Sequence, residues 1–463
     1  MSTHTITFLG GVETVTGSRF LLETENYKLL VEAGMFQGLK ELKLKNWEQF
    51  PIDPGQINAI IITHAHLDHS GYLPRLVRDG FNGKIYLTHD TGKLVEIVLR
   101  DSARLQMEDA KYAEKKGYSK HLKPEALYDI ADATKTISKF VPVDFHKSIN
   151  ISPAISAIFH RSGHILGSSI VEVNLAGKRI VFSGDLGRSQ HPLLNPPDPM
   201  ITGAIDAVVM ESTYGDRKHE DTLHLIEETI NKCVQRNGSI LIPAFAVDRT
   251  EIILMILKRL INENKIPNLP VFVDSPMALA SLNIYKMAMQ AGSSDIKQEL
   301  LDAIKTDDPF NPGNLKGAET VEESKALNDP GKSCIIISAS GMGSGGRVVH
   351  HLENMLPHSE HAVILIGYQA EGTRGRALVE GAKSVKVHGK QISVFAEIVQ
   401  VEGLSVHADA DEVCAWLGTA NSSPAHTFVV HGEPASSAAM AEKINAKLGW
   451  NTVVPRLNQK FYL

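Results

Sequence analysis

Residues 64–69, His-Ala-His-Leu-Asp-His, place four metal-ligand side chains within six positions: His64, His66, Asp68 and His69. The β-branched run at 60–63 predicts a buried strand that ends where the ligands begin. The first two histidines leave extended backbone on one side, whereas the last two ligands follow a turn and can face a different point. This arrangement favours two adjacent metal ions over a closed structural site rich in cysteine. A solvated polar turn would not explain so many imidazoles beside a buried strand.

Five further histidines and acids stand at the ends of predicted strands, mostly beside glycine or other small residues: His164, Asp185, Glu211, His407 and His431. Taken singly, such a residue is more often a cap or a hydrogen-bonding group than a metal ligand. Five of them, in addition to the cluster at 64–69, favour a shared metal site to which several strands deliver ligands.

The elements that must position these residues fall into two patterns. Up to about residue 214, short strands dominate, with a long surface helix predicted over 92–114 and a hairpin over 170–183. From 215 to 389, apolar strands alternate with helical patterns, which is typical of a parallel sheet. Short strands and one helix return from 390 to 463. We therefore predict one domain, residues 1–214 and 390–463, interrupted by an inserted α/β domain at 215–389.

Composition limits the cellular setting. The chain has 463 residues, of which 43% are hydrophobic and 22% charged, and a formal net charge of −6. No apolar run is long enough to span a bilayer, and the first residues lack a secretory pattern. Three widely spaced cysteines fit a reducing compartment and offer no thiolate zinc site. We expect a cytoplasmic protein without a membrane partner.

The ordered motifs resemble those of the β-CASP group of metallo-β-lactamase fold nucleases, over essentially the whole chain. Residues 64–69 resemble the second fold motif, His164 the third and Asp185 the fourth, while Glu211, His407 and His431 resemble motifs A, B and C. Further similar stretches lie at 242–246, 274–277, 340–347 and 367–373. The resemblance implies an α/β fold: a metallo-β-lactamase αββα sandwich interrupted by an inserted β-CASP domain with a mainly parallel sheet.

The same resemblance implies two Zn²⁺ ions per chain and an assignment of their ligands. His64, His66 and His164 would hold the first ion, Asp68, His69 and His431 the second, and Asp185 would bridge them. Neutral imidazoles and carboxylates suit zinc, and paired ions activate water against phosphodiesters. The sequence departs from the family at Glu32, where an aspartate that supports the ligand loop is usual. The extra methylene is expected to shift the support of that loop.

Catalytic roles also follow from the resemblance. Besides the ligand Asp68, we expect His407 to donate a proton to the leaving 3′-oxygen, oriented and kept cationic by Glu211. The alternative is that Glu211 and His407 only buttress the metal site.

A path for the nucleic-acid backbone is predicted in the inserted domain, where a Gly-rich turn precedes a helix and arginines follow. Its predicted residues are Ser340, Gly343, Ser344, Gly345, Gly346, Arg347, Arg374 and Arg376. The alternative is that the glycines only form a tight turn and the arginines are solvated.

The leading functional hypothesis is an RNA-cleaving metalloenzyme, endonucleolytic or 5′-exonucleolytic. A DNA nuclease of the same group is disfavoured by His431, because DNA-directed relatives tend to lack histidine in motif C. A metal-free scaffold subunit of a processing complex is disfavoured because no ligand is missing. A small-molecule hydrolase would not need the large insert. Residues 451–463 are expected to offer a contact for a homodimer.

Overall fold

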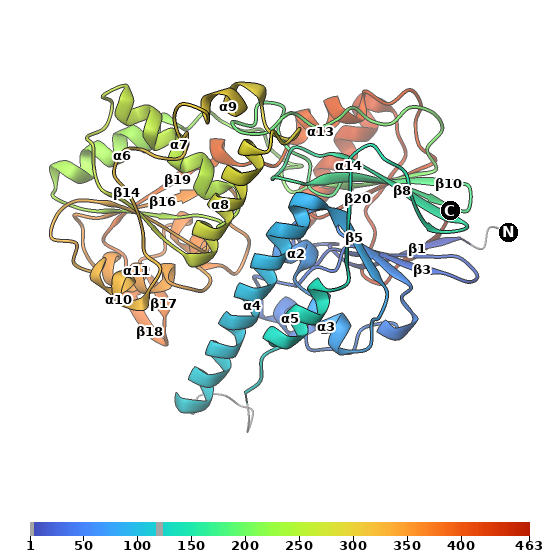
Figure 1. Cartoon of the computed structure of the whole chain (residues 1–463), viewed down its shortest axis with the longest axis horizontal. Helices are drawn as coiled ribbons and strands as arrows, with labels where there is room; N and C mark the ends of the chain where they lie inside the picture. The colour runs from blue at the N-terminus through green and yellow to red at the C-terminus, as the bar shows by residue number, and fades with distance from the viewer. Residues whose placement is uncertain (1–3, 117–123) are drawn as a thin grey trace. The chain divides into compact units, whose positions relative to one another are not determined.

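The computed structural model describes residues 4–116 and 124–463. They form two compact units: one comprises Met1–Lys218 and His407–Leu463, and the other His219–Val406 (Figure 1). Each unit has its own sheets and its own helices, and the second is inserted into the chain of the first. Among the described helices, none is long and apolar enough to cross a membrane.

The first unit is a sandwich of two seven-stranded sheets. In spatial order, the first sheet contains β22 (Lys460–Tyr462), β1 (Thr5–Gly10), β2 (Arg19–Glu23), β3 (Lys28–Val31), β4 (Ala59–Ile61), β5 (Lys84–Thr88) and β6 (Phe140–Val143). The second contains β21 (Thr452–Val453), β20 (His426–Val430), β11 (Ala207–Glu211), β10 (Lys178–Phe182), β9 (Ser169–Leu175), β8 (Ile155–Arg161) and β7 (Ile149–Ser152). The predicted hairpin over 170–183 is confirmed as the antiparallel pair β9 and β10.

The core of this unit lies between the two sheets. Phe8 and Phe20 of the first sheet meet Phe182 and Phe428 of the second, with ring centroids 5.9 Å apart for Phe20–Phe182 and 4.9 Å for Phe8–Phe428. The first four residues of strand β11 are all apolar, and their packing explains why. Its alternate residues face this core and the outer helices, so both faces of the strand are buried.

Helices cover the outer faces of the sandwich, which confirms the predicted αββα order. Helices α13 and α14 pack on the second sheet, where Trp416 and Met440 contribute to one apolar cluster. The long helix α4 contacts β5 and β6 of the first sheet. The helices of this unit are α1 (Lys40–Lys45), α2 (Leu67–Ser70), α3 (Leu73–Arg78), α4 (His89–Lys116), α5 (Ile130–Ile137), α13 (Ala410–Leu417) and α14 (Pro434–Leu448).

The second unit contains a six-stranded sheet whose neighbouring strands are all parallel, as the βαβ pattern predicted. The spatial order is β14 (Leu315–Gly317), β13 (Val271–Asp274), β15 (Ile335–Ser338), β12 (Ile240–Pro243), β16 (Ala362–Ile366) and β19 (Glu397–Val401). A separate antiparallel hairpin joins β17 (Ser384–Val387) to β18 (Lys390–Ser393).

Helices follow these strands along the chain. They are α6 (His224–Gln235), α7 (Arg249–Asn262), α8 (Pro276–Gln290), α9 (Gln298–Ala303), α10 (Val321–Ala326), α11 (Val348–Met355) and α12 (Arg374–Val379). Local signals explain their starts. Ser275 caps α8 by accepting the Ala278 N–H at 3.1 Å, and Pro276 occupies the first helical position.

The C-terminal segment pairs within its own chain. Residues 460–462 form β22 and pair antiparallel with β1, at the edge of the first sheet. The homodimer contact expected from residues 451–463 stays a prediction.

Candidate metal centre

The predicted ligands gather at one edge of the first unit because of strand direction. In the second sheet, β10, β11 and β20 are mutually parallel, and β8 runs the same way because β9 is antiparallel to both of its neighbours. Their carboxyl ends therefore meet at one edge. The residues at or just after these ends are His164, Asp185, Glu211 and His431. The cluster at 64–69 arrives from β4 of the first sheet.

Three histidines form the first group of ligand atoms. The Nδ1 atom of His66 lies 3.1 Å from His64 Nε2 and 3.3 Å from His164 Nε2. One carboxylate oxygen of Asp185, Oδ2, lies 3.4 Å from His64 Nε2 and 3.5 Å from His164 Nε2. These four side chains can therefore converge on a single cation.

A second group lies on the other side of Asp185. Its remaining oxygen, Oδ1, is 3.2 Å from His69 Nε2 and 3.6 Å from His431 Nε2. The Oδ2 atom of Asp68 is 3.8 Å from the same His431 nitrogen. The two oxygens of one carboxylate thus face two separate sets of imidazoles.

The chemistry of this donor set fits bound metal. Asp185 and the rings of His64 and His164 are at most 1% exposed. Both ring nitrogens of His69 and the Oδ1 atom of Asp185 are buried, and none of them has a hydrogen-bond partner among the described residues. Buried polar atoms without such partners are costly, and a cation coordinated by them would offset that cost.

The titration behaviour of three of these histidines points the same way, whereas Asp185 and Glu32 outweigh burial and raise the pKa of His69 well above its usual range. Burial is the first cause that lowers the pKa of His66 and His164 well below the usual range, followed by the neighbouring histidines. Burial also lowers the pKa of His431 to about 3. Neutral imidazole is the form that binds zinc. Burial opposes ionisation of Asp185, yet His69 and His431 outweigh it and hold the pKa of Asp185 well below its usual range.

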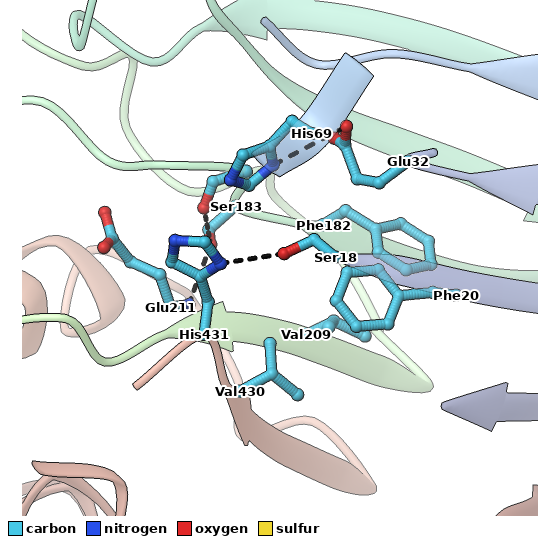
Figure 2. A pocket seen from close by; sticks show the side chains of 11 residues that line it. Ser18, Phe20, Glu32, His69, Phe182, Ser183, Val209, Glu211, Val430 and His431 are labelled. Carbon is cyan, nitrogen blue, oxygen red and sulfur yellow. Dashed lines mark hydrogen bonds and ion pairs between the residues drawn. The ribbon is translucent and has the colours of Figure 1, made fainter. Parts of the chain in front are cut away.

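Polar side chains behind the ligands orient the rings. Two of these side chains, Ser18 and Thr63, were not predicted from the sequence. The Ser18 hydroxyl lies 2.8 Å from His431 Nδ1, and the Thr63 hydroxyl 3.0 Å from His64 Nδ1. Both contacts leave the Nε2 atoms facing the centre. Figure 2 shows Ser18 reaching the ring of His431 beside a pocket whose apolar lining includes Phe20 and Phe182, to the right in this view, and Val430 below.

Glu32, the departure from the family pattern, supports the ligand loop. It is 1% exposed and adopts a left-handed backbone conformation with φ 67°. One carboxylate oxygen accepts the Thr63 N–H at 3.1 Å, and the other lies 3.6 Å from His69 Nδ1 (Figure 2). The longer side chain therefore reaches both the ligand loop and a ligand.

Two glycines permit close backbone approach at the centre. A Cβ on Gly34 would lie 1.7 Å from the carbonyl oxygen of Asp68, and one on Gly187 would lie 2.0 Å from that of Gly163. Any side chain at either position would displace a ligand-bearing loop.

Glu211 and His407 lie beside Asp185 as a joined pair. His407 Nδ1 is 3.0 Å from Glu211 Oε2, and the buried Glu211 carboxylate also accepts the Thr213 hydroxyl and the Leu186 N–H. Glu211 is thus firmly held, whereas the His407 side chain retains 14% exposure.

The residues predicted to bind the nucleic-acid backbone lie in the second unit. The segments 340–347 and 374–376 are brought together, because Arg374 donates to the Gly343 carbonyl and the Gly375 N–H donates to the Met342 carbonyl. Ser344 and Gly345 are exposed, whereas Ser340, Gly346 and Arg376 are half-buried.

Two of the predicted arginines have partners within the protein. The guanidinium of Arg347 donates to Asp274 and to the carbonyls of residues 318 and 319. That of Arg376 donates to Glu380. Binding of nucleic acid by these residues stays a prediction.

Comparison with known proteins agrees with the fold and the centre. Residues 14–223 match the family model of the metallo-beta-lactamase superfamily, and residues 250–378 match the Beta-Casp domain. Residues 391–455 match a domain described as the Zn-dependent metallo-hydrolase RNA specificity domain.

Curated relatives cover nearly the whole chain. Ribonuclease TTHA0252 of Thermus thermophilus is 32% identical over 94% of this chain and 94% of its own length. Two proteins of Methanocaldococcus jannaschii are also similar. An RNase J-like protein is 32% identical over 97% of both chains, and transcription termination factor FttA is 27% identical over 97% of this chain and 70% of its own length.

A two-sheet sandwich with a histidine and aspartate centre, interrupted by a parallel α/β unit, defines a metallo-β-lactamase fold hydrolase. The chain belongs to the β-CASP family of these metal-dependent hydrolases, whose members include ribonucleases.

Proposed function

We propose that this chain is a zinc-dependent ribonuclease that binds two Zn²⁺ ions. One would be held by His64, His66 and His164, the other by Asp68, His69 and His431, with Asp185 shared. The supporting observation is that the two oxygens of Asp185 face opposite sets of imidazoles, at 3.4 and 3.2 Å from the nearest nitrogens. Bound zinc would supply activated water and offset the negative charge that develops on a phosphodiester.

The chain itself offers a proton donor for the leaving oxygen. His407 directs Nδ1 at Glu211 Oε2, 3.0 Å away, and the proton would be delivered from the opposite ring nitrogen, Nε2. Glu211 is held by two further donors and fixes the ring orientation. Because His407 is partly exposed whereas Glu211 is buried, the histidine is the member of the pair that substrate can reach.

RNA is the substrate that the comparisons support. The segment 391–455 matches a domain described by RNA specificity, and two similar proteins are named as ribonuclease or RNase J-like. His431 is a histidine at the motif C position, where DNA-directed relatives tend to lack one. The three cysteines are free and buried, which supports action in a reducing compartment, and we place the activity in the cytoplasm.

The direct test uses zinc-loaded protein with end-labelled RNA and the DNA analogue of the same sequence. We expect cleavage of RNA, with either internal fragments or mononucleotides as products, and much slower cleavage of DNA. Equal cleavage of both would make the protein a general nuclease, and absence of cleavage with full zinc content would contradict the proposal.

The role of His407 is tested by His407→Ala. Both zinc ions should remain, while turnover falls by about 10²- to 10⁴-fold, as for loss of a general acid. A substrate with a 3′-sulfur leaving group needs no protonation, so its cleavage should fall far less. The half-exposed His146, outside the centre, provides a matched control as His146→Ala. Loss of zinc from His407→Ala would show that His407 only buttresses the metals.

A further inference from the structure

A second cluster of metal-ligand side chains lies in the inserted unit, far from the ligand motifs in sequence. His350 and Glu353 stand three positions apart on one face of α11, and His388 stands in the turn between β17 and β18. One ligand atom from each lies within 4.8 Å of the others. The rings of His350 and His388 are 4.4 Å apart between centroids, and His388 Nδ1 is 2.8 Å from Glu353 Oε2.

The donor set has the composition of an open zinc site. Two imidazoles and one carboxylate make three protein ligands, and a fourth position would be left for water or another ligand. Zinc ligands stand about 3.4 Å apart at normal bond lengths, so atoms that lie between 2.8 Å and 4.8 Å apart need only small shifts to share one ion. His350 is exposed and His388 is at the tip of a two-residue turn, so both have room to move.

The carboxylate and one imidazole are already in contact. Glu353 Oε2 lies 2.8 Å from His388 Nδ1, so both atoms can bind the same cation when the ring carries its proton on Nε2.

The backbone at His388 supports a specific use of this residue. His388 adopts φ 45° and Gly389 φ 84°, the left-handed pair that a two-residue hairpin turn requires. Histidine is among the residues other than glycine that adopt this conformation most readily, and the turn places its side chain at the tip of the hairpin.

One charge competes with a cation. The Lys390 ammonium lies 3.2 Å from Glu353 Oε1, but its side chain is 72% exposed. An exposed ion pair of this kind contributes little to stability, so the lysine can turn into solvent when a cation binds.

A comparable cluster in the first unit lacks this freedom. His146 and His160 lie near Asp198, but that carboxylate already accepts from the Arg161 backbone N–H and from two nitrogens of its guanidinium. The partly buried guanidinium contact, made by two nitrogens, neutralises Asp198, so a cation there would meet a competing charge that is held more firmly than an exposed lysine. This cluster therefore serves as a negative control.

We propose that His350, Glu353 and His388 form a third zinc site, separate from the centre in the first unit. Zinc bound there joins α11 to the hairpin β17–β18. The same hairpin is tied to the Gly-rich turn through Arg374, which donates to the carbonyls of Lys386 and Gly343. An ion at this site would thus stabilise the segment in which we predict contacts with the nucleic-acid backbone.

The test counts zinc bound to the full-length protein at equilibrium, for the wild type and for His350→Ala/His388→Ala. We expect the double variant to bind one zinc ion fewer and to lose the zinc-dependent protection of the 384–393 amides from hydrogen exchange. This difference does not depend on how many ions the first unit holds, so it stays informative even if the proposed ribonuclease activity is wrong. Equal zinc content in the two proteins would overturn the site.

Charge variants sharpen the test. Lys390→Gln removes the competing ammonium and should tighten binding of this zinc ion by about 3- to 10-fold. Lys383→Gln removes the same charge at the far end of the hairpin and should change it little. His146→Ala should lose no zinc. Weaker binding in Lys390→Gln, or an equal loss of zinc in His146→Ala, would show that the histidines bind metal only adventitiously.

Discussion

Two aspartates, one in each unit, are fully buried at the end of a strand. The negative charges of their carboxylates are compensated in opposite ways. Asp274 of the second unit accepts from Arg347 at 2.7 Å, from His351 at 2.6 Å and from Ser324 at 2.6 Å. Asp185 of the first unit is surrounded by histidines, and its Oδ1 atom has no hydrogen-bond partner among the described residues.

The difference separates a carboxylate whose charge is compensated within the chain from the one that we propose to bind metal. Burial disfavours the charge of both residues, and in both their partners outweigh it and lower the pKa. At Asp274 the compensating groups are His351, Ser324 and the Arg347 guanidinium, which belong to the chain and satisfy the oxygens. At Asp185 the compensating groups are imidazoles, first His69 and then His431, and its Oδ1 atom keeps no hydrogen-bond partner among the described residues, so a cation from solution can complete the balance.

Replacing the central carboxylate should produce the largest effect. Asp185→Asn keeps the shape but removes the charge shared by both groups of imidazoles. We expect metal affinity to fall by more than about 10²-fold, beyond the range for supporting partners, and RNA cleavage to fall below detection. Zinc analysis by mass spectrometry and a cleavage assay measure the two quantities. Full zinc content in this variant would contradict the shared role of Asp185.

The matched variant in the other unit should affect stability instead. Asp274→Asn leaves the Arg347 guanidinium without its buried counter-charge, at a cost of about 3 to 5 kcal/mol. Denaturant unfolding measures this loss, while the zinc content should remain that of the wild type at low denaturant. A stability change under 1 kcal/mol would indicate that Arg347 is not held by this pair.

In metal-free protein, acid should reduce the stability of the first unit at a higher pH than it reduces that of the region around Asp274. His66, His164 and His431 have lowered pKa values when folded, so the unfolded chain takes up protons first as pH falls below about 6.5. Their stabilising contribution is then lost, by about 1.4 kcal/mol per pH unit for each net proton. The pKa of His69 is raised in the folded chain, so its stabilising contribution is complete and constant below about pH 6.5. The pKa of Asp68 is also raised, so the folded chain takes up this proton first and Asp68 offsets part of the lost stability.

The contribution of Asp274, by contrast, is complete above about pH 3.9 and is lost only as pH falls further through its lowered pKa. Between pH 6.5 and 4, hydrogen exchange should therefore accelerate more in peptides of the first unit that carry His66, His164 and His431 than in those around Asp274, where the smaller lowering of the His350 pKa contributes less. Uniform acceleration in both units would contradict this assignment.

The smallest effects are expected at Glu32. Glu32→Gln keeps the acceptor for the Thr63 N–H but removes the charge that faces His69, so zinc affinity should fall by about 10- to 100-fold. Glu32→Asp restores the usual family residue and keeps the charge, so its affinity should stay within about tenfold of the wild type. Competition with a chelator measures both variants. A larger loss for Asp than for Gln would show that side-chain length matters more than charge.

Much of the fold could be predicted from sequence periodicity. The βαβ alternation predicted the parallel sheet of the second unit, and apolar runs such as 207–211 predicted buried strands, because burial on both faces demands apolar residues throughout. The ligand candidates were also visible, because histidines and acids directly after buried strands are uncommon without a chemical use.

Other features carried no local signal. Ser18 and His431 are 413 residues apart, and nothing in a serine after a short turn indicates that it orients a distant imidazole. The contact between Arg347 and Asp274, a partner 73 residues away, likewise carried no local signal. Phosphate binding by Arg347, predicted from its place after a Gly-rich turn, stays a prediction.

The amino-acid sequence by itself determined which residues can bind metal and that they stand at strand ends, since both properties are local. Only the tertiary structure decided how they are grouped, because the parallel directions of β10, β11 and β20 bring their carboxyl ends to one edge. It also decided which buried acids keep a free oxygen for a cation and which are neutralised by an arginine. That choice depends on what packs against each carboxylate, and chain neighbours do not specify it.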